Sequence, residues 1–276
     1  MLALMNILLA TAIVGVLGLV FGGILAYADK ALAVPQDDRI DKIVEVLPGA
    51  NCGGCGFAGC SNYAESVVSG ESGVNGCPVG GDETARKIAE IMGVEAGSSV
   101  RMRAYVRCAG GDRAENKYDY KGAEDCLAAS IVSGGPKSCS YGCFGLGSCV
   151  RACAFGAIEV KDGKAVVDKE KCTACKKCAE ACPRGIITMI PYDADVRVAC
   201  INCDKGAVVR KICEVGCIGC GICAKTCQYD AIHVENNVAV IDYDKCTRCG
   251  ECAAKCPRKI IEVPAVSEEA AETAEA

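Results

Sequence analysis

The pattern of apolar and polar positions begins with one long apolar segment. Residues 1–28 contain no charged side chain, and about twenty apolar residues are enough for a helix to span a bilayer. The segment predicts a transmembrane anchor over 1–29. A signal peptide is the alternative, since Ala31-Leu32-Ala33 imitates a cleavage site. The segment lacks the basic start of a signal peptide, however, and its apolar run is too long.

Helical periodicity follows. Apolar residues recur at the spacing of one helix face between Ile40 and Leu47. A second helix is predicted over 82–93, with Asp82 or Thr84 near its start. Cysteines lie between the two helices, which indicates a small helical domain built around them.

Two later segments alternate apolar and polar residues around a polar turn, as β-hairpins do. One covers 154–171 with its turn at 161–163, and the other covers 228–245 with its turn at 235–237. The two segments match each other, which indicates an internal repeat. The final stretch, 263–276, is acidic and rich in small residues and predicts a disordered tail.

Cysteine dominates the composition: the 276 residues include 25 cysteines, one histidine and no tryptophan. Disulfides, zinc sites and iron–sulfur clusters are the three candidate chemistries. Disulfide-dense proteins are small and secreted, whereas this chain is long and has an odd number of cysteines. Repeated Cys-x-x-Cys-x-x-Cys triplets also suit one metal centre better than separate bridges.

The charge balance is mildly acidic, with 30 Lys and Arg against 35 Asp and Glu. No basic stripe is evident, which argues against a nucleic-acid partner. The first basic residues, Lys30, Arg39 and Lys42, follow the apolar segment, so the positive-inside rule places the body in the cytoplasm. Thiols stay reduced in that compartment. Gly18 and Gly22 form a small-xxx-small pair on which another membrane helix could pack.

The first cysteine group lies in NCGGCGFAGC and the Cys-Pro pair that follows it. Glycines between the ligands let the backbone wrap a bulky cluster. Zinc is the alternative by spacing alone. The four expected ligands are Cys52, Cys55, Cys60 and Cys77.

Two stretches read C-x2-C-x2-C-x3-C-P. This is the bacterial ferredoxin run, whose fourth cysteine ligates the other 4Fe-4S cluster of a pair. A shift of 74 residues places the run at 172–182 on the run at 246–256, and it also places Cys143, Cys149 and Cys153 on Cys217, Cys223 and Cys227. The repeat predicts two tandem ferredoxin modules with two clusters each.

The repeat is imperfect at one ligand, because Leu146 stands where the second copy has Cys220. Cys139 lies four residues before Cys143, and we infer that it supplies the missing ligand. The expected groups are Cys139, Cys143, Cys149 and Cys182; Cys153, Cys172, Cys175 and Cys178; Cys217, Cys220, Cys223 and Cys256; and Cys227, Cys246, Cys249 and Cys252.

Five cysteines remain outside these groups. Four of them could build a sixth cluster between the domains, and ordinary buried thiols are the alternative. Cys213 falls on Cys139 under the shift and is spare, because its own module already has Cys220. The five are Cys108, Cys126, Cys200, Cys203 and Cys213.

This layout resembles the B subunit of the Rnf complex, a membrane-bound ferredoxin:NAD⁺ oxidoreductase, in its long multi-cluster form. The anchor, PGANCGGCGFAGC with Cys77-Pro78, and the ferredoxin runs carry the resemblance from Met1 to about Val263. NCGGCG also occurs in corrinoid iron–sulfur proteins, but those need a large barrel for which this chain has no room. The resemblance implies a sixth cluster on Cys108, Cys126, Cys200 and Cys213, with Cys203 left over.

The resemblance also implies a function. The chain would accept electrons from reduced soluble ferredoxin and relay them within a complex that reduces NAD⁺ and translocates Na⁺ or H⁺. Its partners would be the membrane and other subunits, including one that carries NAD and flavin chemistry. The iron–sulfur body would lie on the cytoplasmic side of the inner membrane. The alternatives are an electron-transfer subunit of another membrane reductase or hydrogenase complex, or a membrane-anchored zinc-binding interaction protein.

No catalytic constellation beyond the clusters is evident, and no glycine-rich dinucleotide loop precedes a helix. The single histidine, His233, is expected on the surface of the second hairpin. Two basic sets could dock an acidic ferredoxin. They are Lys176, Lys177 and Arg184 in one module, and Arg248, Lys255, Arg258 and Lys259 in the other.

The expected fold class is therefore α+β. Its predicted parts are the anchor (1–29), a small helical 4Fe-4S domain (30–100), a connecting segment with extra cysteines (101–138), a first ferredoxin module (139–190), a second connecting segment (191–212), a second ferredoxin module (213–262) and the tail (263–276).

Overall fold

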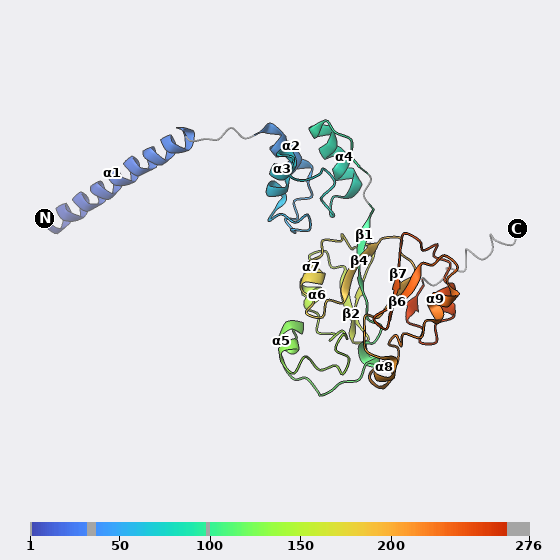
Figure 1. Cartoon of the computed structure of the whole chain (residues 1–276). Coiled ribbons are helices and arrows are strands. Elements are labelled where there is room, and N and C mark those ends of the chain that lie inside the picture. The colour runs from blue at the N-terminus through green and yellow to red at the C-terminus, as the bar shows by residue number, and fades with distance from the viewer. Residues whose placement is uncertain (1, 32–36, 98–99, 264–276) are drawn as a thin grey trace.

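The computed structural model describes residues 2–31, 37–97 and 100–263. Helix α1 (Leu2–Ala31) lies apart from the other elements (Figure 1). Its described apolar side chains are exposed; Val14, for example, is 70% exposed and Leu19 is 80% exposed. Among the described residues, no helix meets the combined requirements of length and apolar character for crossing a membrane. The predicted tail lies outside the described residues.

A small helical domain follows, as predicted. It contains α2 (Asp38–Val46), α3 (Cys60–Val68) and α4 (Gly81–Met92). The Asp37 carboxylate caps α2 by accepting a hydrogen bond from the Arg39 amide. Ile43, Tyr63 and Ile88 contribute one buried side chain from each helix to the core.

The first ferredoxin module is built from two antiparallel strand pairs and two short helices. Strand β1 (Met102–Val106) pairs with β4 (Ile187–Pro191), and β2 (Ile158–Lys161) pairs with β3 (Lys164–Val167). Helices α6 (Ser148–Arg151) and α7 (Lys177–Glu180) lie beside these strands (Figure 1).

The second module repeats this plan. Strand β5 (Arg197–Val198) pairs with β8 (Ile261–Glu262), and β6 (Ile232–Glu235) pairs with β7 (Val238–Ile241). Its short helices are α9 (Ile222–Thr226) and α10 (Glu251–Ala254).

Both predicted hairpins are present. Each closes through a two-residue turn, Asp162-Gly163 in the first module and Asn236-Asn237 in the second, and all four residues have positive φ. Type I′ turns require this backbone, and Asn, Asp and Gly adopt it most readily.

The segments expected to be connections also take part in the modules. Strand β1 lies in 101–138 and β5 lies within 191–212, and each pairs with the last strand of a module. The rest of these segments carries a 3₁₀ turn, η1 (Gly111–Arg113), and the helices α5 (Cys126–Ile131) and α8 (Gly206–Ile212). These strand pairs are formed by residues distant in sequence, which an apolar pattern of two to five residues does not reveal.

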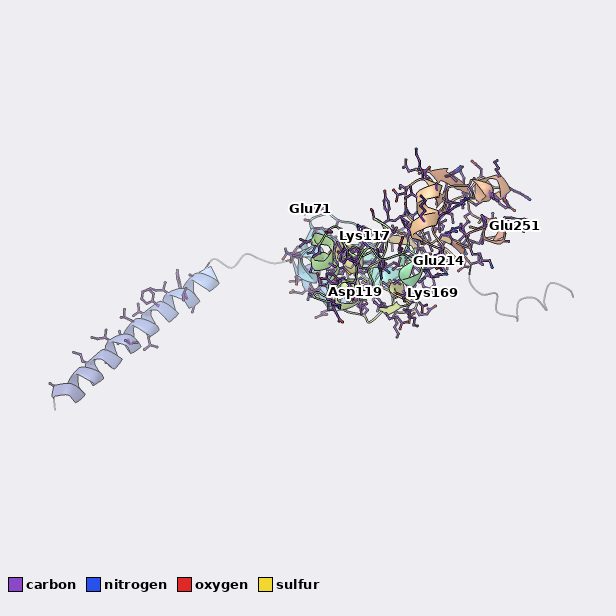
Figure 2. The ribbon with its side chains drawn as sticks, turned by 90° about the horizontal axis from the view of Figure 1, so that it is seen from below. Glu71, Lys117, Asp119, Lys169, Glu214 and Glu251 are labelled. Atoms are coloured by element: carbon purple, nitrogen blue, oxygen red, sulfur yellow. The ribbon has the colours of Figure 1, made fainter. Side chains whose placement is uncertain are left out.

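The two modules share contacts across β1 and β8. The Tyr105 hydroxyl donates to Glu262 Oε2 at 3.0 Å, and the Ala109 amide donates to the Ala199 carbonyl at 2.9 Å. The labelled charged side chains of Figure 2, among them Lys117, Glu214 and Glu251, are exposed and point outward from the body. The buried apolar side chains of the modules, such as Ile158 and Ile232, pack in clusters that also contain cysteines.

Candidate iron–sulfur sites

The helical domain contains a hollow lined by Cys52, Cys55, Cys60 and Cys77. This is the predicted first group. Asn51 orders the loop, because its Oδ1 accepts a hydrogen bond from the Cys60 amide at 2.8 Å. The Gly80 amide donates to Cys77 Sγ at 3.4 Å. Four thiols around one hollow match the ligand number of a 4Fe-4S cluster.

The second module contains two further hollows, and both are lined by the predicted cysteines. One is lined by Cys217, Cys220, Cys223 and Cys256. The other is lined by Cys227, Cys246, Cys249 and Cys252. Burial, followed by the nearby Cys246, Cys223 and Cys249, raises the pKa of Cys252 to about 11. A thiol in such surroundings ionises when a metal centre binds it.

In the first module, Cys178 lies among the three cysteines predicted to join it. Burial, followed by the nearby Cys172, Cys175 and Cys153, raises its pKa to about 11. The Ala157 amide donates to Cys153 Sγ, and the Ala231 amide donates to Cys227 Sγ at the same 3.4 Å. The 74-residue repeat therefore extends to the hydrogen bonds of the ligands.

The other group of the first module differs from the prediction. Burial, followed by nearby thiols that include Cys143, Cys126 and Cys182, raises the pKa of Cys149 to about 12. Cys126 is thus near both Cys149 and Cys143, and we infer that it, and not Cys139, belongs with this group in place of Leu146.

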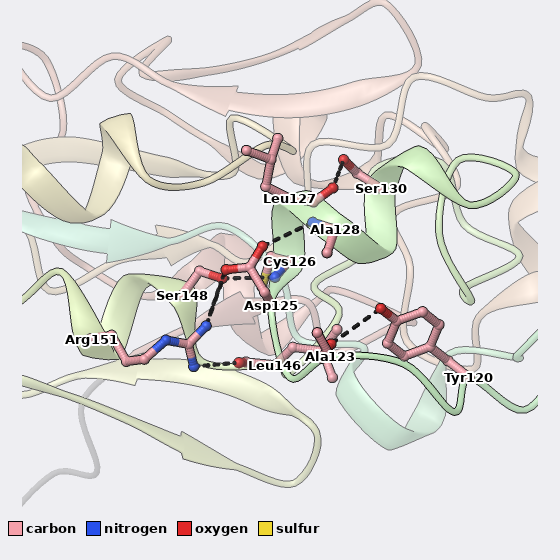
Figure 3. A network of polar contacts seen from close by, with 10 residues as sticks. All are labelled: Tyr120, Ala123, Asp125, Cys126, Leu127, Ala128, Ser130, Leu146, Ser148 and Arg151. Atoms are coloured by element: carbon pink, nitrogen blue, oxygen red, sulfur yellow. Dashed lines mark hydrogen bonds and ion pairs between the residues drawn. The ribbon is translucent and has the colours of Figure 1, made fainter.

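A hydrogen-bond network explains how Cys126 reaches this position (Figure 3). The Cys126 amide donates to Ser148 Oγ at 2.7 Å, and the Ser148 hydroxyl donates to Asp125 Oδ2 at 2.9 Å. Arg151 donates to Asp125 Oδ2 at 3.2 Å and to the Leu146 carbonyl at 3.1 Å. The network joins the start of α5 to α6, the helix that carries Cys149.

The sixth group lies between the modules. Cys108, Cys139, Cys200 and Cys213 line one hollow, which we call the bridging site. The segment 109–116, which follows Cys108, contacts the part of the chain that carries Cys213. Within it, Ala114 forms an antiparallel β-bridge with Cys213. Buried Lys137 donates to the Gly111 and Ala114 carbonyls at 2.8 and 3.3 Å.

These contacts correct the expected grouping. Cys139 was expected with Cys143, and Cys126 with Cys108; the structure exchanges Cys139 and Cys126. Lys137 holds the chain before Cys139 against the segment that pairs with Cys213, so Cys139 lies at the bridging site. The signal was present in the repeat, because Cys139 and Cys213 occupy equivalent positions and both line this hollow.

Contacts link each group to the next. A Cβ on Gly54 would lie 3.0 Å from Cys175 Cα, so the helical domain touches the first module there. Within the first module, Cys178 is near enough to Cys149 to affect its pKa. The Cys143 amide donates to Cys108 Sγ at 3.5 Å.

On the far side of the bridging site, the Cys217 amide donates to Cys200 Sγ at 3.4 Å. Cys223 in turn lies near Cys252. The six groups therefore form one series, which begins in the helical domain and ends at the Cys227 group of the second module.

The remaining predicted residues have these positions. Cys203 is partly buried and donates to the Ile201 carbonyl at 3.4 Å, and it does not line the bridging site. His233 lies on β6 and is partly exposed, and its Nε2 is 3.0 Å from the Asp230 carbonyl.

Among the described residues, no group of three or more His, Cys, Asp or Glu side chains is arranged to hold a single metal ion.

Comparison with known families agrees with the cysteine groups. An Fe-S cluster family model matches residues 47–79, a 4Fe-4S binding domain model matches 165–188, and a 4Fe-4S dicluster domain model matches 216–260. The matched ranges cover the N-terminal site, part of the first module and most of the second module.

Three relatives are similar to this chain over most of its length. The chain is 50% identical to the B subunit of the Na(+)-translocating ferredoxin:NAD(+) oxidoreductase complex of Acetobacterium woodii, over 92% of this chain and 77% of the relative. It is 45% identical to the B subunit of the ion-translocating oxidoreductase complex of Methanosarcina acetivorans, over 91% and 96%. It is 44% identical to the B subunit of the proton-translocating ferredoxin:NAD(+) oxidoreductase complex of Clostridium ljungdahlii, over 91% and 90%. At this identity and coverage, the chain belongs to the family of B subunits of ion-translocating oxidoreductase complexes.

Proposed function

We propose that this chain is the iron–sulfur electron-transfer subunit of a membrane complex that oxidises reduced ferredoxin, reduces NAD⁺ and translocates Na⁺ or H⁺. The observation that carries the proposal is the series of six four-cysteine groups. The relatives named above support the identity of the complex.

Each group would hold one 4Fe-4S cluster, which when bound would accept and donate single electrons. The protein residues bury the site, exclude water and donate N–H groups to the ligand sulfurs. The 24 proposed ligands are every cysteine except Cys203. No glycine-rich dinucleotide loop occurs in the sequence, so the hydride chemistry on NAD⁺ would belong to another subunit.

The outer end of the second module is the proposed docking site for ferredoxin. Cys220 and Cys249 are the two exposed cysteines, and Arg248, Lys255 and Lys259 are exposed near them in sequence. An acidic electron donor would be attracted to this basic set. Arg258 is not free to take part, because it donates to the Cys213 and Gly216 carbonyls.

Each residue of the other candidate set, two of which are exposed, already has a contact within the chain. Lys176 lines the crevice between the helical domain and the first module, and Lys177 lies 3.5 Å from Glu180. Arg184 donates to the Gly134 carbonyl and stacks over the Phe144 ring. Ferredoxin would therefore enter at the second module and not at the first.

Helix α1 is the proposed membrane anchor, with the iron–sulfur body on the cytoplasmic side. The support is its uncharged sequence from residue 1 to 28 and the exposure of its described apolar side chains. Removing residues 1–31 should release the protein from washed membranes while the iron content of the body is retained.

Metal analysis and isolation of the native complex test the function. Protein purified without oxygen should contain roughly 24 irons and as much acid-labile sulfide per chain, by counting six four-iron centres. It should also give low-potential EPR signals on reduction by ferredoxin. Stoichiometric zinc without such signals would contradict the proposal, as would a native complex that lacks a subunit active toward NAD.

A further inference from the structure

Asn202 is a buried polar side chain at the bridging site. It is 2% exposed and lines the hollow together with the four cysteines. A buried amide needs hydrogen-bond partners, because an unsatisfied one costs about 1–3 kcal/mol. Its partners therefore show what the side chain does.

The orientation of the Asn202 amide is fixed by the neighbouring backbone. Its Oδ1 accepts a hydrogen bond from the Asp204 amide at 2.7 Å, so its NH₂ group must point the other way. The NH₂ group donates to Cys139 Sγ at 3.3 Å. The Asn202 backbone amide donates to Cys200 Sγ at 3.5 Å. One residue thus contacts two of the four sulfurs of the bridging site.

The other groups around the site act differently. The Cys143 and Cys217 amides also donate to sulfurs here, but they are backbone groups that no substitution removes. Arg107 and Arg258 lie nearby, but each donates to a backbone carbonyl, of Cys200 and Cys213 respectively. Among the described hydrogen bonds to these four sulfurs, the one from Asn202 Nδ2 has a side-chain donor.

We propose that Asn202 tunes the reduction potential of the centre at the bridging site, through its hydrogen bond to Cys139. An N–H donor withdraws negative charge from a thiolate, which stabilises the reduced state and raises the potential. This inference rests on the proposed function, since it requires a redox centre held by Cys108, Cys139, Cys200 and Cys213. The bridging site joins the two modules, so its potential governs whether single electrons pass between them.

The test is a redox titration followed by EPR on full-length protein purified without oxygen. Comparison with the Cys213→Ser variant identifies the signal that belongs to the bridging site. Asn202→Asp keeps the shape of the side chain and the oxygen that accepts from the Asp204 amide. It replaces the NH₂ donor near Cys139 Sγ with a carboxylate oxygen. We expect a lower midpoint potential for that signal alone, by at least a tenfold change in the equilibrium, which is about 59 mV for one electron.

Asn237→Asp is the matched control. Asn237 lies in the exposed turn between β6 and β7 and contacts the Cys203 carbonyl, not a ligand sulfur. Aspartate tolerates the positive φ of this turn. The control adds the same charge to the same module and should leave the bridging signal unchanged.

Asn202→Ala covers the case in which the added carboxylate of Asn202→Asp prevents assembly of the centre. The alanine variant removes the side-chain donor without adding charge, and it should also lower the potential, with iron content equal to that of wild type. An unchanged potential in an iron-complete variant would overturn the proposal. Loss of about four irons in both variants would overturn it too, because Asn202 would then serve assembly and not tuning.

The proposed function can fail separately. If Cys213→Ser changed neither the iron content nor any EPR signal, no centre would exist at the bridging site, and the inference would fall with it. The other five groups would be untouched by that result.

Discussion

The Asp125 carboxylate accepts a hydrogen bond from the Ser148 hydroxyl at 2.9 Å, and this contact ties α5 to α6. The first ferredoxin copy has Leu146 at the position of a motif cysteine, and Cys126 takes that place from a segment outside the motif. Because Asp125 also caps α5 by accepting from the Ala128 amide at 2.8 Å, the same side chain starts the helix and positions the substitute ligand.

Asp125→Ala should weaken this group selectively. The variant loses the cap on α5 and the acceptor for Ser148 and Arg151, so the loop carrying Cys126 is no longer held against α6. We expect partial loss of up to about four irons per chain, measured after purification without oxygen. Other cluster signals should persist in the EPR spectrum.

Asp119→Ala is the control for this change. Asp119 is exposed and lies in the same connecting segment. Among the described ion pairs, its one partner is Lys121 of that segment. Its iron content should equal that of wild type. Equal iron content in the Asp125 variant would mean that the network does not position Cys126.

Paired cysteine substitutions separate the grouping seen in the structure from the one expected from the motif. Two substitutions at one centre should remove no more iron than one, whereas substitutions at different centres should add. Cys126→Ser with Cys143→Ser, and Cys139→Ser with Cys213→Ser, should each lose about four irons. Cys126→Ser with Cys213→Ser should lose about eight irons, by the same count.

The sequence-based grouping predicts the opposite pattern, since it placed Cys126 with Cys213 and Cys139 with Cys143. A loss of about eight irons from the double variant Cys139→Ser with Cys213→Ser would therefore support the sequence-based grouping. Cys203→Ser is the matched control, because Cys203 lies in the same segment as Cys200 and donates to a backbone carbonyl. It should keep full iron content.

The cysteine motifs were sufficient to predict most of the groups by position, but not the exchange of Cys126 and Cys139. Motif spacing describes ligands that are close in sequence, and the alternation of apolar and polar residues predicted the two hairpins. Cys108, Cys126 and Cys200 reach their sites through β1, α5 and β5, whose partners lie far along the chain. The hydrogen bonds of Lys137 and Ser148 determine which group Cys139 and Cys126 each join. No sequence pattern predicts these hydrogen bonds.

Tyr105→Phe should loosen the contact between the modules without affecting the clusters. The buried hydroxyl donates to Glu262 Oε2 and so links β1 of the first module to β8 of the second. Losing one hydrogen bond to a partly exposed carboxylate should cost roughly 1 to 2 kcal/mol. The midpoint of unfolding in denaturant should fall accordingly, with unchanged iron content before unfolding.

Tyr192→Phe is a suitable comparison, since Tyr192 also donates to a carboxylate, that of Glu170, but at an exposed position within the first module. Its effect on the midpoint should be smaller. Equal midpoints for the two variants would show that the Tyr105 contact does not stabilise the pairing of the modules.

Gly54→Val should separate the helical domain from the first module. A Cβ at Gly54 would lie 3.0 Å from both Cys175 Cα and Pro78 Cγ, and 3.2 Å from the Cys175 carbonyl oxygen, and valine adds two more carbons. Overpacking of this kind costs about 1–3 kcal/mol, which shifts the docking equilibrium by roughly 5- to 160-fold. Small-angle scattering should then show a larger radius of gyration, and electrons supplied by ferredoxin should reach the N-terminal centre more slowly. Gly97→Ala, whose Cβ would meet an ordinary contact at 3.8 Å, is the control, and an unchanged scattering profile in an iron-complete Gly54→Val protein would show that this contact does not hold the two parts together.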